Sequence, residues 1–343
     1  MKKRDYYFDN AKFILIFLVV FGHLIQSYVE TNTIIENVYK LIYSFHMPAF
    51  ILVSGYFAKG IYQNGYVGKL MKKLILPYLI FQIIYTIFYY FLLDKNTLQF
   101  DFLNPQWSLW FLLSLFYWNL MLLAFTKLKP SYAIAIAVTT GLVIGYVDWI
   151  SNYLSLSRTF VFFPFFLVGF YLKREHFQRV ASHKSKLFAM TIVIVIGLIF
   201  VLYPGLDEKW LLGSKPYSDL ETVTAIGILK RMGVYFINFI MVGCFFAFVP
   251  NRKLFFTKWG RNTLYVYLLH GFVIRTFRGS DFEGLIDHSQ TVIILLIIAL
   301  GLTSILSSKF VTVAAQPFIE LKWSRWKQFL GDMKDNLTSA KRA

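Results

Sequence analysis

The residues best suited to chemistry lie in an apolar stretch near the start of the chain, where Lys12 is followed eleven positions later by His23. At about 100° per residue in a helix, this spacing places both side chains on one face, roughly 16 Å apart along the axis. Gln26, Ser27 and Glu30 continue the same polar stripe. A polar stripe is costly against lipid, so we expect it to line a cavity enclosed by protein.

The spacing places His23 near the middle of a hydrocarbon core about 30 Å thick. A neutral imidazole there can act as a general base or as a covalent nucleophile. The residues leave both roles open. Lys12, at the membrane boundary, can bind a phosphate. Asp9 is expected to cap the start of the helix by accepting from backbone N–H groups that have no partner in the first turn.

Two further histidines, His46 and His270, fall about 12 Å into later apolar segments, which brings them close to the depth of His23. Ionisable groups at that depth are candidates for a functional site. Each can instead be a buried polar group bonded between helices, and the sequence leaves both interpretations open. The three histidines lack the spacing of metal ligands and no carboxylate accompanies them, so we expect no metal.

A membrane-embedded helical bundle would position these side chains. The chain has 343 residues, of which 57% are hydrophobic and 20% aromatic. Only 15% are charged, against about 25% in soluble domains. The pattern predicts an all-α fold of about ten transmembrane helices. Their approximate ranges are 12–30, 38–58, 74–93, 107–125, 131–149, 159–172, 187–204, 231–249, 262–278 and 291–314.

The placement of basic residues predicts the orientation of the bundle. With the N-terminus in the cytoplasm, most of the 35 lysines and arginines fall on the cytoplasmic side, so we expect N-in and C-in topology. The net charge of +17 is spread over short loops, which does not favour a nucleic-acid partner. We expect one transmembrane domain over residues 1–315 and a basic cytoplasmic tail over 316–343. The long connection at 205–230 is either a cap over the cavity or a plain connector.

Four lysines follow the second predicted span and would crowd the inner mouth of the cavity below Lys12. They can simply reflect the positive-inside rule. Alternatively, they suit a polyanionic cytoplasmic donor such as a coenzyme A thioester. The lysines are Lys59, Lys69, Lys72 and Lys73.

The first motif resembles that of a known family. Asp9, Lys12 and His23 match the pattern D-x-x-[RK]-x10-H of acyltransferase family 3, the multispan bacterial membrane O-acyltransferases that include the fucose 4-O-acetylase-like group. Many members have Arg where this chain has Lys12. Lysine keeps the charge but loses the bidentate fork of the guanidinium group.

Three later segments resemble the same family in the same order. Residues 44–57, SFHMPAFILVSGYF, match its F-H-M-P-x-F and S-G-Y motif. Residues 107–112 match its W-F-L stretch, and residues 263–270 match its Y-x-x-Y-L-x-H segment. Each motif is weak alone, but together they are specific, and the resemblance covers about residues 5–315.

The resemblance implies transfer of an acetyl or similar acyl group from cytoplasmic acetyl-CoA, a donor substrate and not a resident cofactor. The acceptor would be a hydroxyl of a cell-envelope glycan or lipid-linked sugar, at the bacterial plasma membrane. It implies His23, Lys12 and Asp9 as catalytic residues. The substrate-binding residues would be His46, Ser54, Trp110, His270, Lys69, Lys72 and Lys73.

Two other functions fit the same composition. An exporter or flippase of a glycan or glycolipid would also need a polar stripe and basic inner loops. Transporters often contain two similar halves, and no such repeat is visible here. A membrane sensor is the third possibility, but it would not need a histidine at mid-depth. Oligomeric state cannot be read from the sequence.

Overall fold

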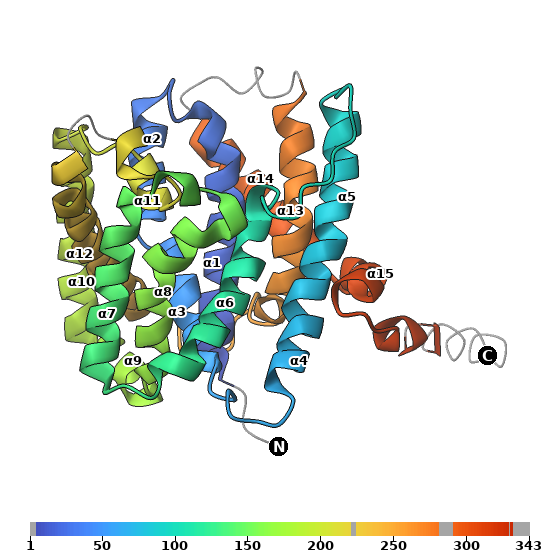
Figure 1. Ribbon diagram of the computed structural model, residues 1–343, viewed down its shortest axis with the longest axis horizontal. Helices are drawn as coiled ribbons and strands as arrows, with labels where there is room; N and C mark the ends of the chain where they lie inside the picture. Colours follow the sequence, from blue (N-terminus) through green and yellow to red (C-terminus); the bar gives the residue numbers. More distant parts are fainter. Residues whose placement is uncertain (1–4, 221–223, 281–290, 329, 332–343) are drawn as a thin grey trace.

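The structure, a computed structural model, describes residues 5–220, 224–280, 291–328 and 330–331, and within these ranges it is helical with no β-strand. Helix α1 (Tyr6–Ile25) lies in the middle of the bundle, as Figure 1 shows. Most of its residues are buried, since it contacts α3, α13 and α14 along its length. The polar stripe is enclosed only in part: Lys12, His23 and Gln26 are half-buried, whereas Ser27 and Glu30, beyond the end of α1, are exposed.

Helices cover most of each of the ten predicted segments. After α1 the chain forms α2 (Thr33–Tyr43), α3 (His46–Phe57), α4 (Tyr66–Leu70), α5 (Leu76–Leu92), α6 (Trp110–Phe125), α7 (Pro130–Val143), α8 (Leu156–Tyr171) and α9 (Arg174–Val180). It continues with α10 (His183–Leu202), α11 (Lys209–Leu212), α12 (Thr224–Phe248), α13 (Thr263–Arg278), α14 (Thr291–Leu306) and α15 (Lys309–Ile319).

Judged by length and composition, fewer helices could cross a membrane than the ten predicted segments. Six helices are long and apolar enough to cross a membrane, or seven if α14 and α15, bent by 65°, form one span. The predicted span 38–58 is broken at Ser44 and Phe45 into α2 and α3. Helix α7 is an apolar helix shorter than a full span. The count of ten and the N-in, C-in orientation stay predictions.

Two glycines allow α3 and α8 to touch backbone to backbone. A Cβ atom on Gly55 of α3 would lie 1.9 Å from the carbonyl oxygen of Phe166. A Cβ atom on Gly169 of α8 would lie 2.0 Å from the carbonyl oxygen of Leu52. Close approach at small residues is a common way for helices to associate in membranes. The contact holds α3, and with it His46 and Ser54, at a defined position in the bundle.

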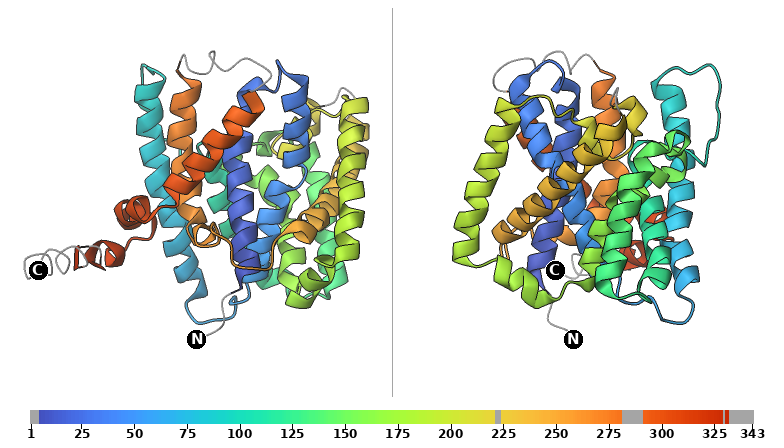
Figure 2. Two further views of the ribbon diagram at one scale, coloured as in Figure 1. Left: turned by 180° about the vertical axis from the view of Figure 1, so that it is seen from behind. Right: turned by 60° about the vertical axis from the view of Figure 1, so that its left-hand side comes forward.

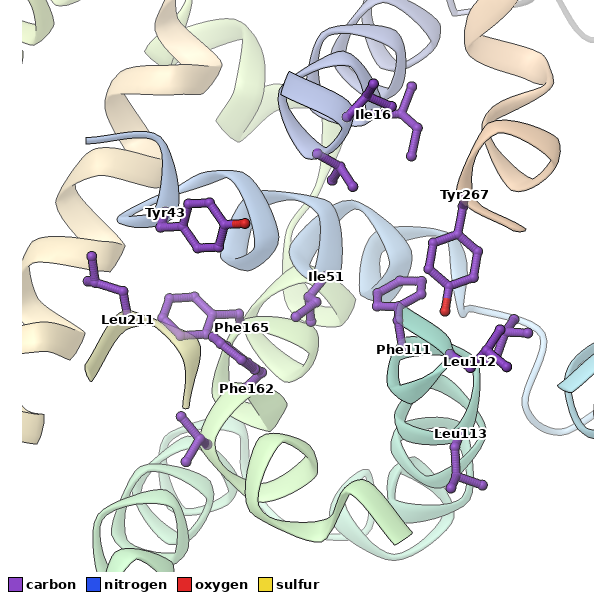
Figure 3. Close-up of a cluster of buried hydrophobic side chains, with 14 of the residues drawn as sticks. Ile16, Tyr43, Ile51, Phe111, Leu112, Leu113, Phe162, Phe165, Leu211 and Tyr267 are labelled. Atoms are coloured by element: carbon purple, nitrogen blue, oxygen red, sulfur yellow. The ribbon is translucent and has the colours of Figure 1, made fainter. Parts of the chain in front are cut away.

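The core around α3 is built from aromatic and aliphatic side chains of many helices. Figure 3 shows Ile51 of α3 surrounded by residues of the neighbouring helices. The labelled side chains are Ile16, Tyr43, Phe111, Leu112, Leu113, Phe162, Phe165, Leu211 and Tyr267, all buried. This packing joins the N-terminal third of the chain to α13.

The connections gather at two ends of the bundle. The start of α1, the 58–65 connection and α9 lie at the lower end of Figure 1, whereas α2 and α11 lie at the upper end. Helix α15 packs against α5 and α13 at the side of the bundle, and residues 320–328, 330 and 331 extend outward from there, as Figure 2 shows. Part of the predicted basic tail, residues 332–343, and residues 1–4 lie outside the described residues, as do 221–223 of the 205–230 connection.

Candidate functional site

A cavity of about 200 Å³ runs beside α1 between His23 and Lys73, and we call it the lysine cavity. Ile16, Val19 and His23 of α1 form one wall at helical spacing. Apolar side chains of α3, α6, α13 and the helical turn 71–75 before α5 form the rest of the lining, with Ser54, Ser108 and Thr263 as isolated hydroxyl groups. The remaining lining residues are Met47, Phe50, Leu74, Trp110, Phe111, Leu112, Leu115, Leu264 and Tyr267.

A second cavity of about 140 Å³, the histidine cavity, lies on the other side of His23. The two cavities share His23, Met47, Ser108 and Trp110 in their linings. The histidine cavity is more polar, and its further lining residues are Gln26, Tyr43, His46, Trp107, Arg158, Phe162, Leu211 and Leu212. His23 is therefore placed where a molecule in either cavity could reach it.

The rings of His23, Trp107 and His270 pack against one another, with the Trp107 and His270 centroids 5.3 Å apart. The His23 centroid is 4.4 Å from that of Trp107 and 5.5 Å from that of His270. The Nδ1 atom of His23 is buried without a hydrogen-bond partner in the described structure. Arg278 donates to the backbone carbonyl of His23 and, at 2.9 Å, to Oε1 of Gln26. Arg278 thus holds the backbone of His23 in place, and the Nδ1 atom of the ring can still form a hydrogen bond.

The other two histidines are held in one tautomer by backbone carbonyls. Nδ1 of His270 lies 3.0 Å from the Val266 oxygen, and Nδ1 of His46 lies 2.9 Å from the Ile42 oxygen. A carbonyl oxygen can only accept, so each neutral ring carries its proton on Nδ1 and leaves Nε2 as an acceptor. Nε2 of His270 is buried and makes no hydrogen bond to the described residues. His270 lines neither cavity and contacts the site through the His23 ring.

The predicted convergence of the histidines is seen in part. His270 stacks near His23, and His46 shares the histidine cavity with it. His46 does not lie deep inside a continuous helix, as expected from the sequence, but is the first residue of α3. The break after α2 is what turns its side chain toward the cavity side of the bundle, next to Tyr43, whose ring lies 4.4 Å away.

The structure corrects the role of Asp9 in the helix start. The N-cap of α1 is Asp5, whose side chain accepts from the N–H of Tyr7 at 3.1 Å. Asp9 lies inside the first turn, buried, with Lys12 Nζ 3.1 Å from its Oδ1 atom. Lys12 lies one turn before Ile16 and does not line either cavity, although it shares the face of His23.

The five remaining predicted binding residues divide into two groups. Ser54 and Trp110 line the lysine cavity, and Trp110 also lines the histidine cavity. Of the loop lysines, only Lys73 lines the lysine cavity. All three lysines are exposed, and Lys69 and Lys72 do not line the cavity.

Three arginines and Trp107 were missed by reasoning from the sequence. Arg275 and Arg278 of α13 pack on the Trp107 ring, with guanidinium carbons 5.1 and 5.8 Å from its centroid. Trp107 has a φ of 33°, which is uncommon for a residue other than glycine. Arg158 lies over Trp110 at 5.0 Å and points into the histidine cavity. Arginines inside or beside apolar segments are the signal that could have identified them.

The cavities contain polar groups suited to acid–base chemistry, and no metal site is evident near them. Among the described residues, no three His, Cys, Asp or Glu side chains are grouped so that they could hold a metal ion. Arg158 supplies a positive charge, and the histidine cavity has no carboxylate in its lining. A cation in a site of low dielectric can stabilise a negatively charged oxygen that develops during a reaction.

Comparisons with known proteins agree with this geometry. The model of a family described as an acyltransferase domain, Acyl_transf_3, matches residues 5–308. The nodulation protein NolL of Sinorhizobium fredii is 28% identical over 320 residues, covering 85% of this chain and 84% of that protein. The nodulation protein NolL of Mesorhizobium japonicum is 42% identical over 83 residues, or 22% of each chain. No solved structure matches the chain.

Proposed function

The chain belongs to acyltransferase family 3 and is a multi-pass membrane O-acyltransferase, and from this premise we propose its donor, acceptor and mechanism. The donor is cytoplasmic acetyl-CoA or a similar acyl-CoA. The acceptor is a hydroxyl group of a cell-envelope glycan or a lipid-linked sugar, at the bacterial plasma membrane. The observation that carries the proposal is the pair of cavities that share His23 as a common wall.

The lysine cavity suits the thioester end of the donor. It is narrow and mostly apolar, which fits an acyl group and an uncharged thiol arm better than a nucleotide. The phosphates would stay at the mouth, where Lys73 lines the cavity and Lys69 and Lys72 are exposed beside it. Point charges of this kind attract a polyanion and hold it without a fixed geometry.

The histidine cavity suits the reacting hydroxyl of the acceptor. His23 takes the hydroxyl proton as the oxygen attacks the thioester carbonyl carbon. The carbon–oxygen bond forms, the carbon–sulfur bond breaks, and the imidazolium returns its proton to the departing thiolate. Arg158, which lines this cavity without a carboxylate partner among the described residues, faces the negative charge that develops on the carbonyl oxygen.

An alternative route uses the same residue as a covalent carrier. The acyl group first moves to His23 with release of coenzyme A thiol, and the acceptor hydroxyl then attacks the acyl-imidazole. This route would let the donor and acceptor occupy their cavities in turn. Trapping of acyl-labelled protein after mixing with radiolabelled acetyl-CoA alone distinguishes it from the general-base route.

The test of the proposed function is acyl transfer by His23 variants. Membranes with matched amounts of wild type, His23→Ala and His23→Gln receive radiolabelled acetyl-CoA, and base-labile label in envelope glycans is measured. We expect both variants to lose at least about 10²-fold in transfer, the lower end of what a general base contributes. Full transfer by His23→Ala would contradict the catalytic role. Retained acetyl ester with lost movement of glycan across the membrane would instead indicate an exporter.

A further inference from the structure

A further cavity, separate from those at His23, contains a concentration of positive charge. It measures about 530 Å³, within the range of about 300–1,000 Å³ that is usual for ligand sites, and we call it the basic cavity. Four cations line it, and no carboxylate from the part of the chain that the structure describes does so. The cations are Lys258, Arg261, Lys309 and Arg325. A cavity with this lining attracts an anion.

The basic cavity lies at the end of the bundle where the chain begins. The helical turn Trp259–Arg261, whose first and last residues line the cavity, packs against the first turn of α1. A Cβ atom on Gly260 would lie 1.9 Å from the carbonyl oxygen of Asp9. Figure 1 shows the start of α1 at the lower end of the bundle. In the predicted N-in orientation this end is cytoplasmic, where anionic lipids give the membrane surface a negative potential.

Helix α14 connects the apolar surface of the molecule to this cavity. Ser307 and Ser308, directly after α14, are part of the cavity lining. One side of α14 is buried, whereas most of its isoleucine and leucine side chains are exposed, among them Ile297, Ile298 and Ile305. In a membrane protein, exposed aliphatic side chains of this kind face lipid. An acyl chain can therefore lie along α14 while its headgroup enters the basic cavity.

Exposed aromatic side chains are neighbours of two of the cations in the chain. Phe310 follows Lys309, and Trp323 and Trp326 lie on either side of Arg325. Tryptophan is enriched where the hydrocarbon core meets the headgroups. These residues indicate that the basic cavity lies at the level of the lipid headgroups.

We propose that the basic cavity binds the headgroup of an anionic phospholipid, with the acyl chains along the exposed side of α14. The proposal does not depend on the proposed function, because this lipid is a bound ligand and takes no part in acyl transfer. A zwitterionic phospholipid has the same phosphate group, but its own cation would meet the four cations of the lining and be repelled. The cavity therefore selects a headgroup with a net negative charge.

The cations of the lining differ in how far the protein already neutralises them. The Arg325 guanidinium is held 5.0 Å from the Tyr265 ring centroid and 3.5 Å from the Glu320 carboxylate, which does not line the cavity. Lys258 and Arg261 are exposed, and no carboxylate of the described residues lies within ion-pair distance of either. These two cations are therefore available to pair with a phosphate group.

Two helices also begin at the basic cavity. The N-cap residues of α13 and α15, Asn262 and Ser308, are both in its lining. The N–H groups of a first helical turn have no partner within the helix and carry partial positive charge. Phosphate groups are common ligands of such helix starts, so the backbone and the side chains of this cavity favour the same kind of ligand.

The first test counts bound lipid by native mass spectrometry of the protein in dodecyl maltoside, with added phosphatidylglycerol or phosphatidylcholine. Wild type should bind phosphatidylglycerol in preference. The double variant Lys258→Gln/Arg261→Gln should raise the half-saturating concentration of phosphatidylglycerol about 5–30-fold, from the loss of two cations near the headgroup. Both side chains are exposed, so the variant is expected to fold.

The matched control is Arg179→Gln/Lys184→Gln, which removes two exposed cations from the connection around α9, at the same end of the bundle. Neither residue lines the basic cavity, so phosphatidylglycerol binding should stay at the wild-type level. An equal loss in both double variants would overturn the site, because net charge alone would then explain binding. Equal binding of the two lipids by wild type would mean an adventitious lipid only and would overturn it as well.

The second test distinguishes a lipid headgroup from other sources of phosphate. Thermal unfolding in detergent is followed with phosphatidylglycerol, inorganic phosphate or adenosine 3′,5′-bisphosphate, the nucleotide part of coenzyme A. Phosphatidylglycerol should raise the midpoint of wild type about twice as much as that of Lys258→Gln/Arg261→Gln, because a ligand of the native state stabilises it. The two small anions should affect both proteins equally. A variant that loses stabilisation by either small anion but keeps that by the lipid would overturn the proposal without touching the proposed function.

Discussion

At the scale of single residues, Lys12 can contribute both to the stability of the fold and to binding of the donor. Its ammonium group lies 3.1 Å from the carboxylate of Asp9, which is 4% exposed. Its side chain is itself about a quarter exposed and approaches the Phe57 ring at 5.8 Å. A cation next to a buried carboxylate supports folding, whereas an exposed cation near the lysine cavity can hold a donor phosphate. Removal of the Asp9 carboxylate separates the two roles. It ends the need for a cation in folding but leaves the contact of Lys12 with a donor phosphate unchanged.

We expect Lys12→Ala to lower both stability and donor use. Loss of one hydrogen bond to a charged group is worth about 1.5–3 kcal/mol, or roughly 10–150-fold in the KM for acetyl-CoA if Lys12 binds the donor. The double variant Asp9→Asn/Lys12→Met removes both charges and should recover most of the thermal stability in detergent, but not the KM. Recovery of both would mean that Lys12 acts only through Asp9.

At the scale of the helices, the position of α3 depends on its contact with α8. The reciprocal approach of Gly55 to the Phe166 carbonyl and of Gly169 to the Leu52 carbonyl leaves no room for a methyl group. Helix α3 carries His46 at its start and Ser54 near its end. A displaced α3 would therefore change the lining of both the lysine cavity and the histidine cavity.

The corresponding prediction is that Gly55→Ala or Gly169→Ala destabilises the protein. Forcing extra volume into a packed interface typically costs about 1–3 kcal/mol, and the displacement of backbone atoms puts both variants at the upper end. Thermal unfolding in detergent measures the effect. Gly197→Ala on α10 is the control, since a Cβ atom there meets nothing within 4 Å and alanine favours the helix. Equal midpoints for all variants would contradict the close contact.

At the scale of the whole molecule, three cavities are joined by shared lining residues. The lysine cavity shares His23 with the histidine cavity, which shares Gln26 and Leu212 with a third cavity. Lys73 lines the first cavity, and Glu30 and Glu208 line the last. Figure 1 shows the start of α1 at the lower end of the bundle and α11, which follows Glu208, at the upper end. If the N-terminus is cytoplasmic, the donor and the acceptor approach His23 from opposite faces of the membrane.

Cysteine labelling tests this orientation. In a Cys244→Ala background, a single cysteine at Gln99 should react with a membrane-impermeant maleimide added to intact cells, because the 93–106 connection is expected outside. Cysteines at Asn64 and Lys253 should react only after the cells are permeabilised. All three native residues are exposed, so access is limited by the membrane and not by burial. Labelling at Asn64 in intact cells would reverse the orientation.

From the sequence, the candidate site could be predicted only where its residues follow one another on a single helix face. The helical spacing of His23, Gln26 and Glu30 indicates one cavity-lining face, and in the structure all three residues line cavities. The spacing could not identify Tyr39 or Arg158, because each is brought to the cavities by a different helix. The sequence also could not separate Lys73 from Lys69 and Lys72, since it does not show how the helical turn 71–75 packs against α6.

The sequence by itself determined that this protein is a helical membrane protein and an acyltransferase of family 3. Long apolar segments can satisfy their backbone polar groups in lipid only as helices, and the motifs around His23, His46 and His270 occur in the family's order. Only the tertiary structure decided that Asp5 and not Asp9 caps α1, that 38–58 is two helices, and that three cavities are joined by shared lining residues. These features depend on contacts between residues far apart in the chain, such as those of α1 with α13 and of α3 with α8, which no local periodicity encodes.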